Sequence, residues 1–163
     1  MREIIVYTDG SCHTQLLIGA WAAILLIAGQ RIELSGVENN TTHNAMELVA
    51  VIKAIEYLSE HYPSLPTINI VTDSQYVSGL FARESKLSSA GFITKKGNEL
   101  RNAELVKRLY ELNANHQLHF TKVKAHQKTR EVENINDEVD MLVRGIMRRE
   151  VEQRNTLQKS LYY

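Results

Sequence analysis

The chain contains four aspartates, and two of them, Asp9 and Asp73, stand at positions suited to building a site. Each directly follows a run of apolar and β-branched residues, at 4–8 and 67–72, that is typical of a buried strand. Because neighbouring parallel strands of an α/β sheet bring their C-terminal ends to one edge, we expect the two carboxylates to lie close together. A single aspartate often only opens a turn, but the matched pair favours a functional site.

Two further carboxylates fall on predicted helices. Glu47 lies three residues after Asn44, which is the spacing of a capping box, so one interpretation of Glu47 is a structural role at the start of a helix. Asp140 lies one helical turn from Asn136 and Arg144, on a face that is equally compatible with simple exposure to solvent. Neither carboxylate identifies a site by itself.

The hydrophobic pattern predicts the elements that must position these side chains. Strands are predicted at residues 4–8, 19–27, 31–37, 67–72 and 118–124, and helices at 44–61, 103–113 and 134–149, with a further helix starting near residue 75. The first three strands form an antiparallel meander, with a turn cluster at 9–11 after the first. The helix at 44–61 is a crossover that makes the fourth strand parallel to the first. The predicted fold is α/β, with a mixed five-stranded sheet flanked by helices.

The composition is that of one globular domain. The chain has 163 residues, of which 44% are hydrophobic and 23% charged, so a disordered or low-complexity protein is excluded. The formal net charge is zero, which argues against a nucleic-acid binder that relies on charge alone. Residues 1–80 carry an excess of acidic side chains and residues 81–163 an excess of basic ones. This sorting is compatible with chance or with an acidic site flanked by basic contacts.

Three features bear on location. Cys12 is the single cysteine and cannot form an internal disulfide, so no oxidising compartment is required. The N-terminus runs directly into the first predicted strand without a signal-peptide pattern. The longest apolar run, at 20–28, is shorter than the roughly 20 residues of a membrane span. We therefore expect a cytoplasmic protein without a membrane segment.

Five short sequence blocks contain the residues that could take part in catalysis or binding. They are Tyr-Thr-Asp-Gly-Ser-Cys at 7–12, Asn-Ala-Met-Glu-Leu at 44–48, Thr-Asp-Ser-Gln-Tyr-Val at 72–77, Val-Lys-Ala-His at 123–126, and Asn136 together with Asp-Met-Leu-Val-Arg at 140–144. In order and spacing these blocks resemble type 1 ribonuclease H over residues 3–147. One Asp-Gly-Ser would be weak evidence, whereas five blocks in register are strong.

The resemblance implies an activity as well as the fold. From this resemblance, we expect the chain to be an endonuclease that hydrolyses the RNA strand of RNA–DNA hybrids and leaves 5′-phosphate and 3′-hydroxyl ends. The same resemblance makes four carboxylates both metal ligands and catalytic residues: Asp9, Glu47, Asp73 and Asp140. Two Mg²⁺ ions are the implied cofactors, with Mn²⁺ as a substitute.

Elementary electrostatics supports a cation at such a cluster. Two ionised carboxylates about 4 Å apart repel by roughly 4 kcal/mol at an effective dielectric constant of about 20. A group of four therefore needs divalent cations or bound protons, and two ions also suit an in-line displacement at phosphorus. Asp137 is the rival for the fourth position because it lies three residues before Asp140, but the Asp-x-Leu-x-Arg register of the resemblance selects Asp140.

A histidine completes the predicted catalytic set. His126 lies in a predicted loop beside Lys124 and Lys128, where a histidine is commonly just solvated. By the resemblance, it matches the family histidine that assists proton transfer or product release. A titratable and mobile imidazole suits both tasks.

Discrimination of RNA from DNA requires hydrogen-bonding groups for 2′-hydroxyls. The resemblance assigns Asn44 and Gln75 to the minor groove of the hybrid and Thr42 to a DNA phosphate. The alternatives are an N-cap role for Asn44 and ordinary turn polarity for Thr42. Lys95 and Lys96 fall in the segment of the family's basic protrusion, which grips the backbone of the hybrid.

Two segments depart from the family pattern. The family often continues its first block with a glycine- and proline-rich turn that contains a substrate-binding Asn, whereas residues 13–19 are His-Thr-Gln-Leu-Leu-Ile-Gly. His43 stands where one of two adjacent Asn residues is usual. We expect changed substrate affinity or site preference, with the metal chemistry unaffected. Because the pattern begins at residue 3, no separate N-terminal hybrid-binding domain is expected.

Residues 1–149 are predicted to form the catalytic domain, followed by a tail at 150–163 with no structural assignment. We expect a monomer that acts on the hybrid. Two other interpretations stand beside this one: a different nuclease of the same superfamily, such as a transposase, resolvase or proofreading exonuclease, and a non-catalytic module that binds hybrids. The third and fourth blocks together argue against the former, and the complete set of carboxylates with His126 argues against the latter.

Overall fold

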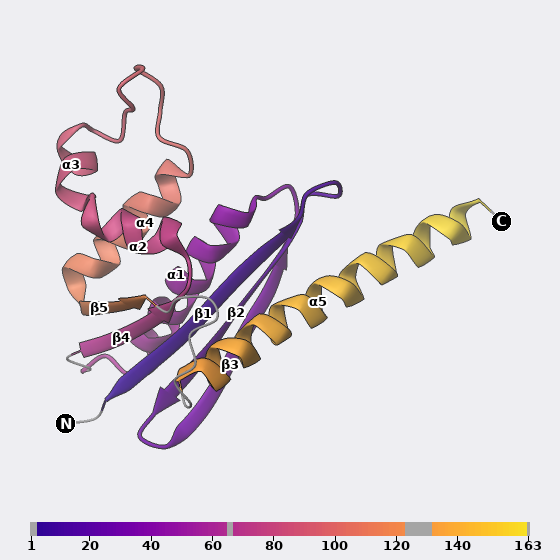
Figure 1. Cartoon of the computed structure of the whole chain (residues 1–163), viewed down its shortest axis with the longest axis horizontal. Helices are drawn as coiled ribbons and strands as arrows, with labels where there is room; N and C mark the ends of the chain where they lie inside the picture. Colours follow the sequence, from indigo (N-terminus) through magenta and orange to yellow (C-terminus); the bar gives the residue numbers. More distant parts are fainter. Residues whose placement is uncertain (1–2, 65–66, 123–131, 163) are drawn as a thin grey trace.

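A five-stranded sheet forms the centre of the computed structural model, which describes residues 3–64, 67–122 and 132–162. The strands are β1 (Ile4–His13), β2 (Ile18–Ile27), β3 (Gln30–Glu38), β4 (Thr67–Thr72) and β5 (Gln117–Lys122), in the spatial order β3-β2-β1-β4-β5 (Figure 1). The first three are antiparallel neighbours, whereas β4 is parallel to β1 and β5 is parallel to β4. The predicted mixed sheet is confirmed.

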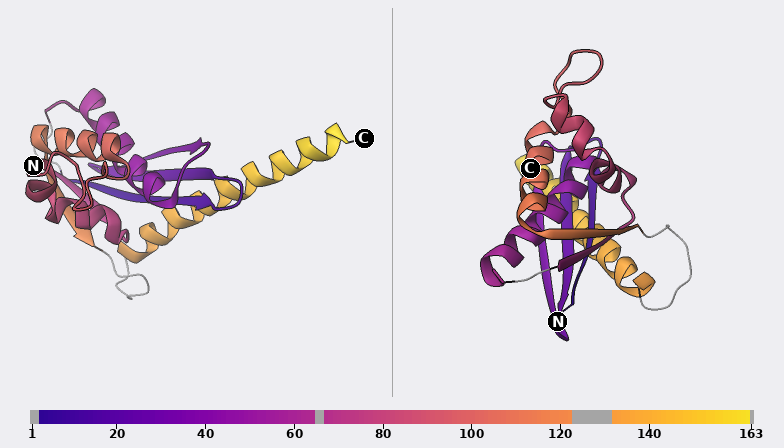
Figure 2. Two further views of the ribbon diagram at one scale, coloured as in Figure 1. Left: turned by 90° about the horizontal axis from the view of Figure 1, so that it is seen from above. Right: turned by 90° about the vertical axis from the view of Figure 1, so that its left-hand side faces the viewer.

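Helices cover both faces of this sheet (Figure 2). They are α1 (His43–His61), α2 (Gln75–Ala82), the short α3 (Glu84–Ser89), α4 (Ala103–Asn115) and α5 (Val132–Leu161). The larger core lies between the sheet and the face covered by α1, α2 and α4. A smaller core lies under α5, where Val139 and Val143 pack against Tyr7 and Val71.

Successive side chains of β1 point to opposite faces of the sheet and therefore pack against different helices. Ile4 and Val6 belong to the core on the α1 face, and Tyr7 belongs to the core under α5. By the same alternation, Asp9 shares the face of Tyr7, and Gly10 falls on the α1 face. The Asp9 carboxylate therefore lies on one face of β1, and Gly10, which has no side chain, lies on the other.

β1 runs through the predicted turn at 9–11, so that prediction is wrong. β2 pairs with β1 over its whole length, from Ile4 opposite Ile27 to His13 opposite Ile18. This antiparallel partner overrides the turn preference of Asp-Gly-Ser. β4 pairs with β1 only as far as Val71 opposite Tyr7, so Asp9 lies two residues beyond the end of the parallel pairing.

The start of α1 also differs from the prediction. Thr42 is the N-cap, because its Oγ1 accepts a hydrogen bond from the backbone N–H of Ala45 at 3.2 Å. The alternative of Asn44 as an N-cap is therefore wrong, and Glu47 does not belong to a capping box that starts there. α1 consequently presents Glu47 to the interior, where it is buried.

α5 is longer than the sequence pattern predicts. An end near residue 149 was expected, but the helix continues to Leu161 because residues 150–161 contain neither Gly nor Pro. Its C-terminal part extends past the sheet (Figures 1 and 2), and Arg154 donates a hydrogen bond to Asn39 after the end of β3. Within the described ranges, none of the helices combines the length and the apolar character needed to cross a bilayer.

Candidate active site

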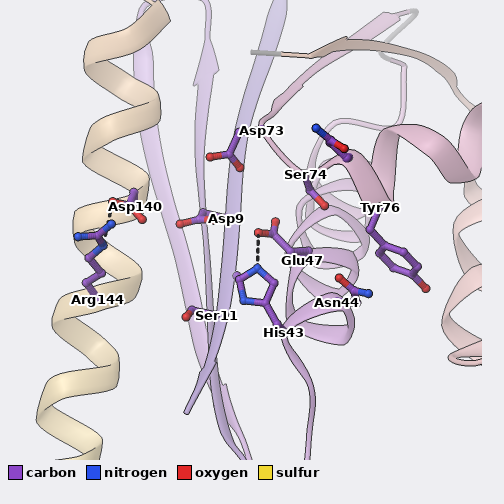
Figure 3. Close-up of a pocket in the computed structure, with 12 residues that line it drawn as sticks. Asp9, Ser11, His43, Asn44, Glu47, Asp73, Ser74, Tyr76, Asp140 and Arg144 are labelled. Atoms are coloured by element: carbon purple, nitrogen blue, oxygen red, sulfur yellow. Dashed lines mark ion pairs between the residues drawn. The ribbon is translucent and has the colours of Figure 1, made fainter. Parts of the chain in front are cut away.

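Three carboxylates meet at the edge of the sheet beyond the β1–β4 pairing (Figure 3). One oxygen each from Asp9, Glu47 and Asp73 lies within 4.8 Å of the other two. The register explains two of the three, since Tyr7 stands opposite Val71 and each aspartate follows two residues later. The prediction that Asp9 and Asp73 lie close together is confirmed.

Glu47 joins the two aspartates because Gly10 lets α1 approach β1 closely. A Cβ atom at Gly10 would lie 2.3 Å from the carbonyl carbon of Met46 and 2.4 Å from the amide nitrogen of Glu47. No side chain fits in that space. The backbone of Gly10 also lowers the pKa of both Asp9 and Glu47, against the larger effect of burial. One glycine thus sets both the position and the local polarity of the pair.

Burial dominates the electrostatics of Asp9 and Glu47, which are only 8% and 4% exposed. Burial raises the pKa of Asp9 to about 7, and the charges of Asp73 and Asp140 contribute to the rise. Burial and the neighbouring Asp9 charge raise the pKa of Glu47 to about 10. Without a cation, the pair therefore retains at least one proton near neutral pH.

Asp73 is half-buried, and groups on α1 and α5 influence its pKa. Burial raises its pKa, and the Asp140 charge adds to the rise, while its own backbone N–H, the side chain of His43 and a hydrogen bond from Asn136 oppose it. Asn136 thus brings a polar group of α5 to the end of β4, and no role for it is predicted from the sequence. Its signal was the spacing of Asn136 one helical turn before Asp140.

Asp140 faces the same pocket from α5 but stands outside the close group of three. Its Oδ2 lies 3.0 Å from Nε of Arg144, one turn along the helix (Figure 3). Its charge raises the pKa of both Asp9 and Asp73, which places it within electrostatic reach of them. Asp137 is exposed and does not line the pocket.

The carboxylates open onto a pocket of about 500 Å³. Its rim is polar and comes from β1, α1, the start of α2, and α5; it includes Ser11, His43, Asn44, Ser74, Gln75, Tyr76 and Arg144. Ser74 is the N-cap of α2 and accepts a hydrogen bond from the N–H of Val77. The pocket is large enough for a phosphodiester and the atoms around it.

The predicted substrate-binding residues fall into two groups. Asn44 and Gln75 are exposed and line the pocket. Thr42 is exposed beside it as the N-cap of α1, and Lys95 and Lys96 lie on an exposed loop between α3 and α4, away from the carboxylates. His126 lies outside the described residues.

Sequence comparison identifies the family. The sequence profile of RNase H matches residues 1–148 of the chain. The chain belongs to the RNase H family. Ribonuclease H of Wolbachia pipientis wMel is 37% identical over 144 residues, which cover 88% of this chain and 94% of the relative. Ribonuclease H of Xanthomonas campestris pv. campestris (strain 8004) is 38% identical over 146 residues, covering 89% and 92%. Membership of RNase H, a family of metal-dependent nucleases, confirms the resemblance and makes the chain an enzyme.

The donor set of this RNase H fits a divalent cation. Carboxylate oxygens are the ligands that Mg²⁺ and Mn²⁺ take in proteins. Glu47 Oε2 is buried and has no hydrogen-bond partner in the described part of the chain. A buried carboxylate oxygen without a partner is costly unless a proton or a cation satisfies it. The three clustered carboxylates of this RNase H can therefore hold a metal ion.

Proposed function

We propose that this RNase H is an endonuclease that hydrolyses the RNA strand of RNA–DNA hybrids. Family membership supports the proposal, and one observation carries it: Asp9, Glu47 and Asp73 present oxygens within 4.8 Å of one another at the floor of a polar pocket. A buried group of like charges has no structural benefit of its own. Its use is to bind divalent cations against a phosphodiester.

Asp9, Glu47 and Asp73 are proposed as the metal ligands, with Asp140 as the fourth. We expect two Mg²⁺ ions, for which Mn²⁺ can substitute. When bound, the ions supply a nucleophilic water and stabilise negative charge at the phosphate and at the leaving oxygen. Asp140 lines the same pocket but stands outside the close group of three and pairs with Arg144, so it would complete the ligand set from the α5 side.

The reaction is a balanced hydrolysis. The water oxygen forms a bond to phosphorus, the bond from phosphorus to O3′ breaks, and the proton lost by the water is balanced by one gained at O3′. The products are a 5′-phosphate and a 3′-hydroxyl. His126 is proposed to assist the proton transfer or product release, and Asn136, which lowers the pKa of Asp73, is proposed to orient that carboxylate.

The polar rim of the carboxylate pocket is proposed to recognise the RNA strand. Asn44 and Gln75 are exposed polar side chains beside the carboxylates, which suits contacts to 2′-hydroxyls and base edges in the minor groove. Thr42, Lys95 and Lys96 are proposed to contact the phosphate backbone, where charge and hydroxyl donors supply affinity without sequence preference.

The proposed unit of function is a cytoplasmic monomer with residues 1–149 as its catalytic domain and 150–163 as a tail. The unpaired Cys12 is compatible with a reducing compartment.

The test is a cleavage assay on three duplexes of one sequence: an RNA–DNA hybrid, double-stranded RNA and double-stranded DNA. With Mg²⁺ we expect internal cleavage of the RNA strand of the hybrid alone, with products that carry 3′-hydroxyls, and no cleavage in EDTA. Cleavage of double-stranded DNA would favour a different nuclease of the superfamily. Tight hybrid binding without cleavage under any divalent ion would favour a binding module.

A further inference from the structure

His43 stands beside the buried end of Glu47 at the rim of the carboxylate pocket. The two residues are one helical turn apart on α1, and His43 Nε2 lies 3.6 Å from Glu47 Oε1 (Figure 3). The His43 side chain is 62% exposed, whereas that of Glu47 is 5% exposed. The accessible imidazole stands outside the close group of Asp9, Glu47 and Asp73, and it faces the candidate metal centre through Glu47, from the rim of the same pocket.

The separation of the two atoms suits shared ligation of one ion. It exceeds the distance of an N–H···O hydrogen bond, which is about 2.7–3.2 Å. Two ligand atoms each about 2.1 Å from an ion, at an angle of about 90–120°, lie about 3.0–3.6 Å apart. The Glu47 side chain is buried, and its second oxygen, Oε2, has no hydrogen-bond partner among the described residues, so a cation at Oε1 leaves an oxygen that can also take a ligand position.

We propose that His43 pairs with Glu47 as a mixed nitrogen–oxygen ligand set, which gives this centre a preference for Mn²⁺ over Mg²⁺. The proposal rests on the proposed function in one respect, namely that the same carboxylates bind the activating ion. It replaces the expectation from the sequence that His43 leaves the metal chemistry unaffected.

The chemical reason is the difference between the two ions. Mg²⁺ takes oxygen ligands almost exclusively and keeps several waters. Mn²⁺ also takes oxygen ligands, and as a first-row transition ion it binds imidazole nitrogen more readily than Mg²⁺ does, but more weakly than the later divalent metals do. Adding His43 to a carboxylate centre therefore strengthens Mn²⁺ binding and leaves Mg²⁺ binding nearly unchanged.

The first measurement is binding of each ion to the full chain in the absence of nucleic acid, with any affinity tag removed. Calorimetric titrations with MnCl₂ and with MgCl₂ are compared for the wild type, His43→Asn and His119→Asn. His119 is an exposed histidine on β5 that does not line the pocket, so it controls for loss of a surface imidazole. Glu47→Gln tests the carboxylate half of the pair.

The second measurement is the pulsed electron paramagnetic resonance spectrum of bound Mn²⁺, in which a ligated imidazole nitrogen appears as a characteristic coupling. His126 also carries an imidazole and lies outside the described residues, so the spectrum is recorded for His126→Asn as well. The nitrogen signal is assigned to His43 only where it disappears in His43→Asn and persists in His126→Asn.

We expect His43→Asn to weaken Mn²⁺ binding by about tenfold and Mg²⁺ binding by less than about twofold, with loss of the nitrogen coupling. His119→Asn should match the wild type, and Glu47→Gln should weaken both ions. An unchanged ratio of Mn²⁺ to Mg²⁺ affinity in His43→Asn, or a spectrum without a His43-dependent coupling, overturns the proposal. In that case a changed KM for the hybrid alone would identify His43 as a substrate contact.

Failure of the proposed function would look different. It would appear as absence of hybrid cleavage by the wild type with either ion, whatever the affinities and spectra. A wild type that cleaves hybrids and binds Mn²⁺ without nitrogen ligation retains the proposed function and loses only the role of His43.

Discussion

Gly10 and Glu47 are in direct backbone contact, since a Cβ atom at Gly10 would lie 2.4 Å from the amide nitrogen of Glu47. This contact joins β1 to α1 at the point where Asp9 leaves one element and Glu47 the other. The distance between the two buried carboxyl groups is therefore set by a residue that itself has no side chain. Any atom added at Gly10 must push α1 away from β1.

Gly10→Ala is expected to destabilise the fold by about 1–3 kcal/mol and to weaken Mg²⁺ binding, because displacement of α1 separates Glu47 from Asp9. Urea unfolding and calorimetric titration with Mg²⁺ measure the two effects. Gly79→Ala is the matched control: Gly79 lies within α2 with open space around its Cα, so the change should raise stability by about 0.5–1 kcal/mol. Normal Mg²⁺ affinity in Gly10→Ala would contradict this role of the contact.

The prediction of the fold succeeded where the signal was local. The β-branched run of β4 ends at a polar Asp-Ser-Gln, and its predicted bounds agree with the structure. β1 extends further than predicted because its last five residues depend on pairing with β2, a partner that propensity at 9–11 does not reveal. The C-terminal end of α5 was not predicted correctly, because the composition of residues 150–161 does not distinguish a helix from an unstructured tail.

In the candidate site, too, some residues were predictable from the sequence and others depend on tertiary packing. Strand order predicted that Asp9 and Asp73 would meet, because both follow parallel strands. For Glu47 the local sequence favoured a capping box equally well, and only the close packing of α1 on Gly10 brings it to the cluster. The Asn136 contact with Asp73 depends on how α5 crosses the sheet, which no local pattern specifies.

Asp9→Asn is expected to abolish nearly all Mg²⁺-dependent cleavage of the hybrid while the fold persists, because it removes a ligand charge from the cluster. Without metal, the variant should be more stable than the wild type by about 1 kcal/mol at pH 8, since at this pH Asp9 is ionised and the substitution removes a buried charge that Asp73 and Asp140 repel. Cleavage rates and unfolding in EDTA measure both effects. Glu104→Gln, which changes a carboxylate that is 87% exposed, should alter neither. Near-normal turnover in Asp9→Asn would remove it from the ligand set.

The stability of the metal-free protein is expected to fall as the pH rises from 5 to 8. The folded pKa values of Asp9 and Glu47 lie near 7 and 10, above those of the unfolded chain. The native state therefore keeps protons that the unfolded state has released, and each retained proton lowers the free energy of unfolding by up to about 1.4 kcal/mol per pH unit. Urea unfolding in EDTA at four pH values measures the slope.

Two comparisons assign that slope to the carboxylate pair. Glu47→Gln should flatten it, because the proton on Glu47 no longer contributes. Saturating Mg²⁺ should oppose it, because the ion binds the deprotonated carboxylates and stabilises the native state more as the pH rises. A slope that is the same in Glu47→Gln and in the wild type would mean that other groups cause it.

His126→Ala is expected to reduce turnover by about a hundredfold with little change in KM for the hybrid. The reason is that its proposed role is in proton transfer or product release, and neither contributes to ground-state binding. Steady-state kinetics on a single hybrid separate kcat from KM, with His119→Ala as a control for loss of an exposed imidazole. A raised KM with unchanged kcat would identify His126 as a phosphate contact.

Asp140 and Asp137 provide a paired test of the fourth ligand. Three residues apart on a helix, they point within about one-sixth of a turn of each other, so helix geometry alone does not separate them. The structure does: Asp140 lines the pocket and contacts Arg144 at 3.0 Å, whereas Asp137 is exposed outside it. Asp137 lies in the second turn of α5, where a carboxylate contributes at most a few tenths of a kcal/mol through the helix dipole.

Asp137→Asn should therefore change stability by a few tenths of a kcal/mol and leave cleavage unchanged. Asp140→Asn should cut cleavage severely, and the loss should be greatest at low Mg²⁺, because a centre with one ligand fewer needs a higher ion concentration to fill. The cleavage rate of the hybrid is measured against Mg²⁺ concentration for both variants, and the Mg²⁺ midpoints are compared. If Asp137→Asn shifts the Mg²⁺ midpoint and Asp140→Asn does not, α5 supplies its ligand from one turn earlier, and the Asp140–Arg144 pair is only a surface contact.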